Sequence, residues 1–285
     1  MITVDCRNLE GRVRVPLSKS LAHRWMICSF LAERSFDINE KYGPLCDDLK
    51  ATHRCLSVLS DGGEVLDCGE SGTTLRLLLP VTAAMGKAVT FRRRGSLVSR
   101  PIAELVDELN RHGACIETDG PDLSVRGCLS AGEYVLPGNI SSQYVSGLLL
   151  AFSAMEGECS LKLSSELESA PYVKMTEYVI REFADADDAD LLERKLLEGD
   201  WSAGAMWHAA DVLLGGRLDI EGLSKDTIQG DVRIMELVDP DGSDRDLTVD
   251  VSDCPDIVPA IALAMLKASA TLRITGAGRL CSGVM

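Results

Sequence analysis

The sequence has few aromatic residues, no long apolar run and no excess of basic residues. Phe, Tyr and Trp make up 5% of its 285 residues. The longest apolar runs, near 144–155 and 257–266, are shorter than the roughly 18 residues that a membrane-spanning helix needs. The formal net charge of −15 argues against nucleic acid as a partner, because binding to a phosphate backbone needs a basic face. The N-terminus also lacks a basic-then-apolar signal pattern. We therefore expect a cytoplasmic protein that binds neither membrane nor nucleic acid.

The ten cysteines and four histidines show no metal-ligand pattern. No two cysteines are spaced as C-x-x-C, and most lie in apolar segments. In a reducing cytosol such cysteines are typically small core residues rather than disulfides or zinc ligands. The histidines have no ligand spacing either, so we expect them on helix surfaces: His23, His53, His112 and His208.

An apolar helix followed by an alternating strand recurs five times. The expected pairs are 20–32 with 35–38, 73–85 with 87–91, 142–155 with 159–163, 202–214 with 217–220, and 256–268 with 271–274. Further amphipathic helices are expected at 47–59, 101–112, 171–183 and 229–238. This alternation predicts an α/β protein built from repeated supersecondary units. The acidic segment 185–190 is expected to be a solvated loop, with a domain boundary near 184–200.

A short strand leads into the first helix through Ser18, Lys19 and Ser20. Such a junction offers free backbone N–H groups, the positive end of a helix dipole, hydroxyls and an ammonium group, with Arg24 one turn further along. These groups suit a phosphate. The alternative is that Ser20 only caps the helix and Lys19 is a solvated charge.

Other expected helix starts are polar in the same way. Gly72 permits close approach of the backbone before the hydroxyls of Thr73 and Thr74, and Arg100 precedes a proline-initiated helix. Serines open two further helices, at 141–144 and 169–172. Each start alone is explained by ordinary capping. Together they favour an anion-binding site formed by several helix N-termini.

These motifs, in this order, resemble the 5-enolpyruvylshikimate-3-phosphate synthase family, the 3-phosphoshikimate 1-carboxyvinyltransferases of the shikimate pathway. The matching segments cover nearly the whole chain: 18–20 with Arg24, 70–76, 100–102, 141–144, 169–172, 199–202, 229–231 and 255–259.

The resemblance implies a two-domain enolpyruvyl transferase fold, an inside-out α/β barrel of strand–helix units with the active site in the cleft between the domains. The first domain would comprise 16–197 in three units, and 1–15 plus 198–285 would form an incomplete second domain. The implied reaction transfers the enolpyruvyl group of phosphoenolpyruvate to the 5-hydroxyl of shikimate 3-phosphate and releases phosphate. A monomer that acts on these small anionic substrates is expected, with no metal or organic cofactor.

The family motifs also imply a role for each matching residue. Lys19 would contact both substrates, and Asp256 would accept the proton of the 5-hydroxyl. Shikimate 3-phosphate would be bound by Lys19, Ser20, Arg24, Ser141, Ser142, Gln143, Ser169, Tyr172 and Asp256. Phosphoenolpyruvate would be bound by Lys19, Gly72, Thr73, Arg100 and Gln143. For Asp256 the alternative is an ordinary helix-capping carboxylate.

The sequence departs from the family pattern at two places. Glu70 stands where many members carry asparagine, and its carboxylate would repel phosphoenolpyruvate unless it is turned away or paired with Arg76 or Arg100. After Leu280 the family continues into an Arg-x-Lys-Glu-Ser-Asp-Arg motif, whereas this chain ends at Met285. We therefore expect a C-terminally truncated member, whose activity stays open. The alternatives are a non-catalytic remnant that binds shikimate 3-phosphate and, less favoured, a UDP-N-acetylglucosamine enolpyruvyl transferase.

Overall fold

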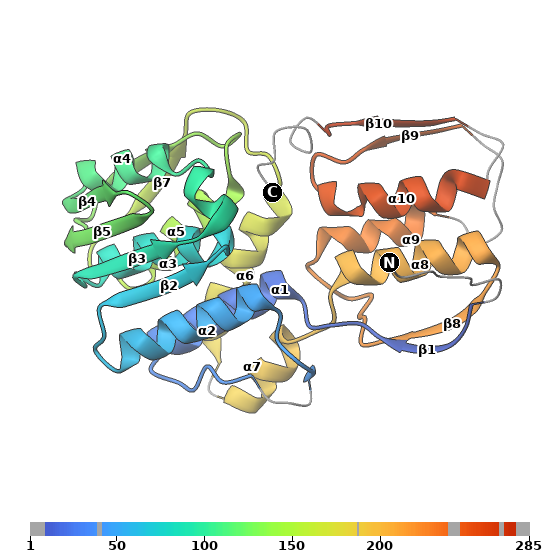
Figure 1. The fold of residues 1–285 in the computed structure, drawn as a ribbon, viewed down its shortest axis with the longest axis horizontal. Coiled ribbons are helices and arrows are strands. Elements are labelled where there is room, and N and C mark those ends of the chain that lie inside the picture. The colour runs from blue at the N-terminus through green and yellow to red at the C-terminus, as the bar shows by residue number, and fades with distance from the viewer. Residues whose placement is uncertain (1–8, 39–41, 187, 239–245, 268–270, 278–285) are drawn as a thin grey trace. The chain divides into compact units, whose positions relative to one another are not determined.

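The computed structural model describes residues 9–38, 42–186, 188–238, 246–267 and 271–277 (Figure 1). The described chain divides into two compact units. The larger unit is Lys19–Leu197, and the smaller unit combines 9–18 with the described part of 198–277. The predicted domain boundaries, 16–197 against 1–15 plus 198–285, stay a prediction.

The larger unit carries a mixed four-stranded sheet in the order β2-β3-β5-β4 and a two-stranded parallel sheet of β6 and β7 (Figure 1). Its strands are β2 Val65–Gly69, β3 Val89–Arg93, β4 Ala114–Asp119, β5 Asp122–Gly127, β6 Glu133–Leu136 and β7 Ser160–Leu163. Its helices are α1 Lys19–Leu31, α2 Asp47–Ser60, α3 Gly72–Ala84, α4 Ala103–Arg111, α5 Ser142–Phe152, α6 Ala170–Asp185 and α7 Ala189–Leu196.

Two apolar helices, α3 and α5, form the centre of this unit. They pack along each other, and α6 packs against α5. Leu75, Leu78 and Leu148 are fully or almost fully buried. The close approach depends on Gly147, because a Cβ there would collide with the backbone oxygen of Arg76. Helices that are apolar on every side are typical of a buried position. Among the described residues, no helix is both long and apolar enough to cross a membrane.

The smaller unit contains two parallel strand pairs, β1 with β8 and β9 with β10. Its strands are β1 Glu10–Arg14, β8 Arg217–Glu221, β9 Leu247–Asp250 and β10 Leu272–Thr275. Its α-helices are α8 Trp201–Leu214, α9 Ile234–Leu237 and α10 Val258–Ala264, with short 3₁₀ turns at Gly230–Arg233, Pro255–Ile257 and Met265–Lys267. The core lies where α8 meets α10, through small side chains such as Ala205, Ala209 and Ala260.

Most expected elements are present, and the α/β class is confirmed. The strand expected at 35–38 is wrong, because no strand is formed there. The Ser35 hydroxyl accepts a hydrogen bond from the Asp37 backbone N–H at 3.3 Å, a local bond that competes with strand pairing. The loop expected at 185–190 is also partly wrong. Asp188 caps a further helix, α7, by accepting from the N–H groups of Asp190 and Leu191.

The expectations for histidine and cysteine are corrected in part. His23 is fully buried rather than on a helix surface. The expected core position holds for Cys28, Cys55, Cys68 and Cys254, but Cys46, Cys115 and Cys128 are exposed and Cys159 is half-buried. Cys6 and Cys281 lie outside the described residues. The prediction rested on the apolar character of each segment, which does not tell whether a given cysteine lies on the buried or the exposed face of its helix or strand.

Candidate active site

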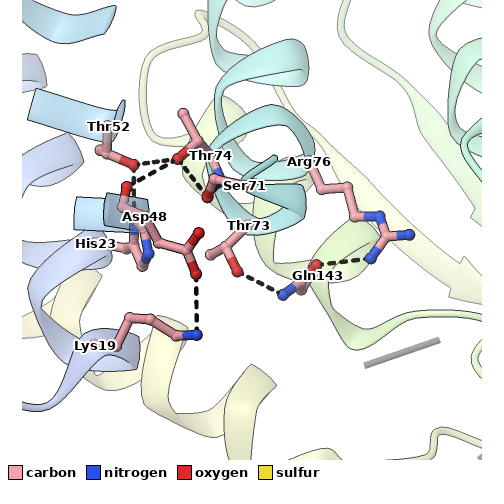
Figure 2. Close-up of polar contacts among 9 residues, drawn as sticks. All are labelled: Lys19, His23, Asp48, Thr52, Ser71, Thr73, Thr74, Arg76 and Gln143. Atoms are coloured by element: carbon pink, nitrogen blue, oxygen red, sulfur yellow. Dashed lines mark hydrogen bonds and ion pairs between the residues drawn. The ribbon is translucent and has the colours of Figure 1, made fainter. Parts of the chain in front are cut away.

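Polar contacts connect the first turns of α1, α2, α3 and α5 (Figure 2). The Nζ of Lys19, the first residue of α1, lies 3.0 Å from Oδ2 of Asp48. The Thr74 hydroxyl donates to the Asp48 backbone oxygen at 3.3 Å. The Gln143 amide donates to the Thr73 hydroxyl at 2.9 Å. The predicted residues at these helix starts therefore lie in one connected region.

The ion pair between Lys19 and Asp48 is partly open to solvent, with side-chain exposures of 46% and 35%. Burial by itself would raise the pKa of Asp48, but the charge of Lys19 and a hydrogen bond from it outweigh that effect. The pKa of Asp48 is consequently lowered. The Asp48 carboxylate is therefore ionised at neutral pH, and nearly half of the Lys19 side chain is exposed to solvent.

A chain of buried side chains, linked by hydrogen bonds, adjoins this region (Figure 2). Nδ1 of His23 lies 2.7 Å from the Thr52 hydroxyl, which lies 2.7 Å from the Thr74 hydroxyl. Oγ1 of Thr74 in turn lies 2.8 Å from the Ser71 hydroxyl oxygen. Burial lowers the pKa of His23 to about 3, so the ring is neutral at physiological pH. His23 thus acts as a structural link between α1, α2 and α3.

The N-terminus of α3 is capped by Ser71, whose hydroxyl accepts from the Thr74 backbone N–H. A Cβ at Gly72 would lie 3.0 Å from Nη1 of Arg100 and 3.6 Å from Nη1 of Arg76. The guanidinium groups of Arg100 and Arg76 therefore lie close to Gly72, the first residue of the 13-residue helix α3. Helix N-termini with nearby arginines bind phosphate and carboxylate groups.

Arg76 also orients the neighbouring amide. Its Nη1 donates to Oε1 of Gln143 at 3.0 Å, which leaves the Gln143 NH₂ facing the Thr73 hydroxyl (Figure 2). Its Nη2 donates to the Pro101 backbone oxygen at 3.1 Å. The side chain of Arg76 is almost fully buried. This arginine was not a predicted binding residue, although its position one helical turn after Gly72 signals that it faces the same way.

Arg24 is almost completely buried, unlike an open ligand-binding arginine. It donates to Thr176 Oγ1 at 2.7 Å, the Ser20 backbone oxygen at 2.7 Å, Ser146 Oγ at 3.2 Å and the Tyr172 backbone oxygen at 3.0 Å. Burial lowers its pKa to about 10, so it remains charged at neutral pH. These bonds fasten the first turn of α1 to α5 and α6.

The remaining predicted residues of the larger unit open α1, α5 and α6. Helix α1 begins at Lys19, so Ser20 lies in its first turn and is not its N-cap. The Ser141 hydroxyl caps α5 by accepting from the Gln143 N–H, and Ser142 begins that helix. Ser169 precedes α6 in the left-handed region, with φ of 56°. Its backbone oxygen accepts from the Tyr172 N–H at 3.1 Å.

Asp256 belongs to the smaller unit, whereas the other predicted site residues belong to the larger unit. It is exposed in the 3₁₀ turn Pro255–Ile257, and Cys254 rather than Asp256 is the N-cap of that turn. Burial raises the pKa of the nearby Asp231 to about 7, with the charges of Asp256 and Asp200 acting in the same direction. A hydrogen bond from Ser202 opposes this rise. Asp231 can therefore hold or release a proton near neutral pH.

Asp48, which pairs with Lys19, was not among the residues predicted from the sequence. It lies in the first turn of α2, where acidic residues are common because they complement the helix dipole. Nothing in its local sequence distinguishes it from Asp47 beside it. Among the described residues, no group of three or more His, Cys, Asp or Glu side chains is arranged to hold a metal ion.

The fold resembles two solved structures of EPSP synthase from Acinetobacter baumannii, with TM-scores of 0.70 and 0.72 at 20% identity. Each likeness covers 96% of this chain, and 75% and 76% of the solved chains respectively. The protein thus has the two-domain inside-out α/β fold of the enolpyruvyl transferases. Residues 57–283 also match the family model for EPSP synthase (3-phosphoshikimate 1-carboxyvinyltransferase). The chain belongs to this family.

Curated relatives carry the same name. The 3-phosphoshikimate 1-carboxyvinyltransferase of Clostridium kluyveri is 28% identical, over 98% of this chain and 76% of that protein. Its counterpart in Clostridium novyi is 30% identical, over 95% and 75% respectively. The one in Methanospirillum hungatei is 30% identical, over 92% and 74%. The family predicted from the sequence motifs is confirmed.

Proposed function

We propose that this chain is a 3-phosphoshikimate 1-carboxyvinyltransferase, which transfers the enolpyruvyl group of phosphoenolpyruvate to the 5-hydroxyl of shikimate 3-phosphate. The 5-hydroxyl oxygen forms a bond to C2 of phosphoenolpyruvate, and the bond from C2 to the phosphate oxygen breaks. The hydroxyl proton is lost and the phosphate leaves as inorganic phosphate, so atoms and charge balance. Family membership and the anion-binding arrangement at α3 support this assignment.

The observation that carries the proposal is the arrangement around Gly72. Arg100 and Arg76 face the first turn of α3, and Gln143 is held against Thr73. In the proposal, Arg100 binds the phosphoenolpyruvate anion together with the backbone at Gly72 and Thr73. A planar guanidinium can bind phosphate or carboxylate through two parallel hydrogen bonds, which a lysine cannot do.

The same proposal assigns shikimate 3-phosphate to the starts of α1, α5 and α6. Lys19 contacts both substrates, and the other ligands are Ser20, Arg24, Ser141, Ser142, Gln143, Ser169 and Tyr172. Four of the five N–H groups of Arg24 are donated to protein oxygens, so one remains for this substrate. Its main contribution would be to hold the first turn of α1 in place.

Asp256 completes the proposal as the group that accepts the proton of the 5-hydroxyl. Asp231, whose pKa is raised to about 7, is suited to share that proton with it. We also propose that the protein is a cytoplasmic monomer and, because of its net charge of −15, does not bind nucleic acid.

The decisive experiment measures phosphate release from the purified chain with both substrates. A steady rate that requires shikimate 3-phosphate and vanishes in Arg100→Ala supports the proposal. Calorimetric binding of shikimate 3-phosphate without any phosphate release would instead identify a non-catalytic binding module. Phosphate release that depends on UDP-N-acetylglucosamine would identify that compound, and not shikimate 3-phosphate, as the acceptor substrate.

A further inference from the structure

We propose that Glu70 is a positioning residue, which fixes the segment Gly95–Ser99 and thereby holds Arg100 at the N-terminus of α3. The inference rests on the proposed function, because it makes Glu70 a determinant of phosphoenolpyruvate affinity. Nothing in the family motifs assigns this role, and the sequence alone suggested that a carboxylate here would hinder anion binding.

The contacts of Glu70 are directed at one turn. Its Oε2 accepts from the backbone N–H of Ser96 at 3.0 Å and from the Ser96 hydroxyl at 3.0 Å. The carboxylate also covers Gly95, whose φ of 49° places it in the left-handed region, and a Cβ there would collide with it. Glu70 therefore fits against the start of the 3₁₀ turn Gly95–Ser99, which ends immediately before Arg100.

Other groups hold the same segment at its edges. Arg93 is buried, and it donates to the Val98 backbone oxygen at 3.4 Å and to the Pro121 backbone oxygen at 2.6 Å. Arg76 donates to the Pro101 backbone oxygen on the other side of Arg100. Leu97 is buried beneath the turn. Glu70 adds the contact to the first half of the turn, so its loss should loosen Arg100 without unfolding the unit.

The orientation of the Glu70 carboxylate explains how an acidic residue can lie near a proposed anion-binding site. Its oxygen accepts hydrogen bonds from Ser96. Hydrogen bonds from the Ser96 backbone and hydroxyl lower the pKa of Glu70, and the charge of Arg100 lowers it further. The side chain is therefore ionised at neutral pH. Its Oε2 accepts hydrogen bonds from Ser96, and these bonds compensate the negative charge of the carboxylate. The carboxylate therefore repels phosphoenolpyruvate less than an uncompensated charge would.

The experiment compares Glu70→Ala and Glu70→Gln with the wild-type chain. For Glu70→Ala we expect the KM for phosphoenolpyruvate to rise about tenfold, the effect of losing one charge-assisted hydrogen bond. The KM for shikimate 3-phosphate should stay within about twofold of wild type, because Glu70 has no contact at the starts of α1, α5 or α6. Glu70→Gln keeps an acceptor oxygen for Ser96 and should recover most of the affinity.

Glu117→Ala is the matched control, since it removes an exposed carboxylate from β4 of the same unit. Hydrogen exchange of the Ser96 amide in the substrate-free protein gives a second readout, and we expect faster exchange only in Glu70→Ala. Unchanged exchange and unchanged phosphoenolpyruvate KM in that variant would overturn the inference. An equal rise in the KM for phosphoenolpyruvate and the KM for shikimate 3-phosphate would also overturn the inference. If wild type binds neither substrate, the proposed function fails, while the Ser96 exchange rate still decides whether Glu70 anchors the turn.

Discussion

The residues assigned to the proposed site include cations in the larger unit and acidic residues in the smaller unit. In the larger unit, Lys19, Arg76 and Arg100 stand at the starts of α1 and α3. In the smaller unit the corresponding groups are acidic: Asp200 caps α8, and Asp231 and Asp256 lie in 3₁₀ turns. The charged helix starts of the larger unit therefore favour an anion, and the smaller unit holds a carboxylate that can keep a proton near neutral pH.

The largest effect is expected from removing the ammonium of Lys19. We expect Lys19→Met to lower kcat/KM by roughly 10³-fold, because it loses charge-assisted hydrogen bonds worth about 1.5–3 kcal/mol each to two substrates. Steady-state phosphate release measures the change. Lys50→Met, which removes an exposed lysine from α2, serves as the control and should retain wild-type rates. Comparable losses in both variants would mean that overall charge, rather than the position of Lys19, matters.

The Asp231→Asn variant tests whether a buried carboxylate of the smaller unit binds a proton near neutral pH. The pKa of Asp231 is raised from 3.8 to about 7, so the folded state binds more protons than the unfolded state between these values. Stability should fall as pH rises from about 4 to 7, by at most about 4 kcal/mol. Asp231→Asn should abolish this part of the pH dependence. Urea unfolding at pH 4.5 and pH 8 tests it, and an unchanged pH slope in the variant would show that Asp231 ionises freely.

A smaller effect is expected from Gly72→Ala. The new Cβ would lie 3.0 Å from Nη1 of Arg100, so the guanidinium must shift by a few tenths of an ångström. We expect the KM for phosphoenolpyruvate to rise about tenfold, as for one weakened charge-assisted hydrogen bond, with unaltered thermal stability. Phosphoenolpyruvate titration at saturating shikimate 3-phosphate measures this. An unchanged KM would place the anion away from the α3 N-terminus.

The smallest effect is expected at Arg94, a cation that is not among the proposed binding residues. Arg94 pairs with Asp67 at 2.6 Å on the surface of the larger unit. The hydrogen bond from Arg94 is the main reason that the pKa of Asp67 is lowered to about 2. This stability is present above pH 3.8 and lost as pH falls through about 2. Because the side chain of Arg94 is 59% exposed and that of Asp67 is 27% exposed, solvent weakens the pair, and Asp67→Asn should cost less than about 1 kcal/mol at pH 7 and leave catalysis intact.

Sequence reasoning succeeded where periodicity and capping act locally. The expected helices at 20–32, 73–85 and 202–214 each agree with the structure to within one residue at either end. It failed where a side chain from elsewhere decides the outcome. His23 looks like any helix-surface histidine until Thr52, 29 residues away, is placed against its ring. Asp188 was taken for part of a solvated acidic run because its capping role depends on backbone geometry.

The predicted site residues show the same division. Helix-start serines and Gly72 could be read from motif and spacing, since caps have local signatures. The direction of Glu70 could not, because it depends on Ser96 in a turn 26 residues later. The structural role of Arg24 could not be predicted from the local sequence either, since it donates hydrogen bonds to residues of α5 and α6.

The hydrogen bonds of Arg24 to α5 and α6 affect the order in which parts of the chain can fold. Arg24 is bonded to residues 122 to 152 positions further along the sequence. Contacts of such long range are slow to form, because the intervening loop must close before they contribute. Because a chain is synthesised from its N-terminus, the bond that holds the first turn of α1 against α6 can form only after Thr176 has been synthesised.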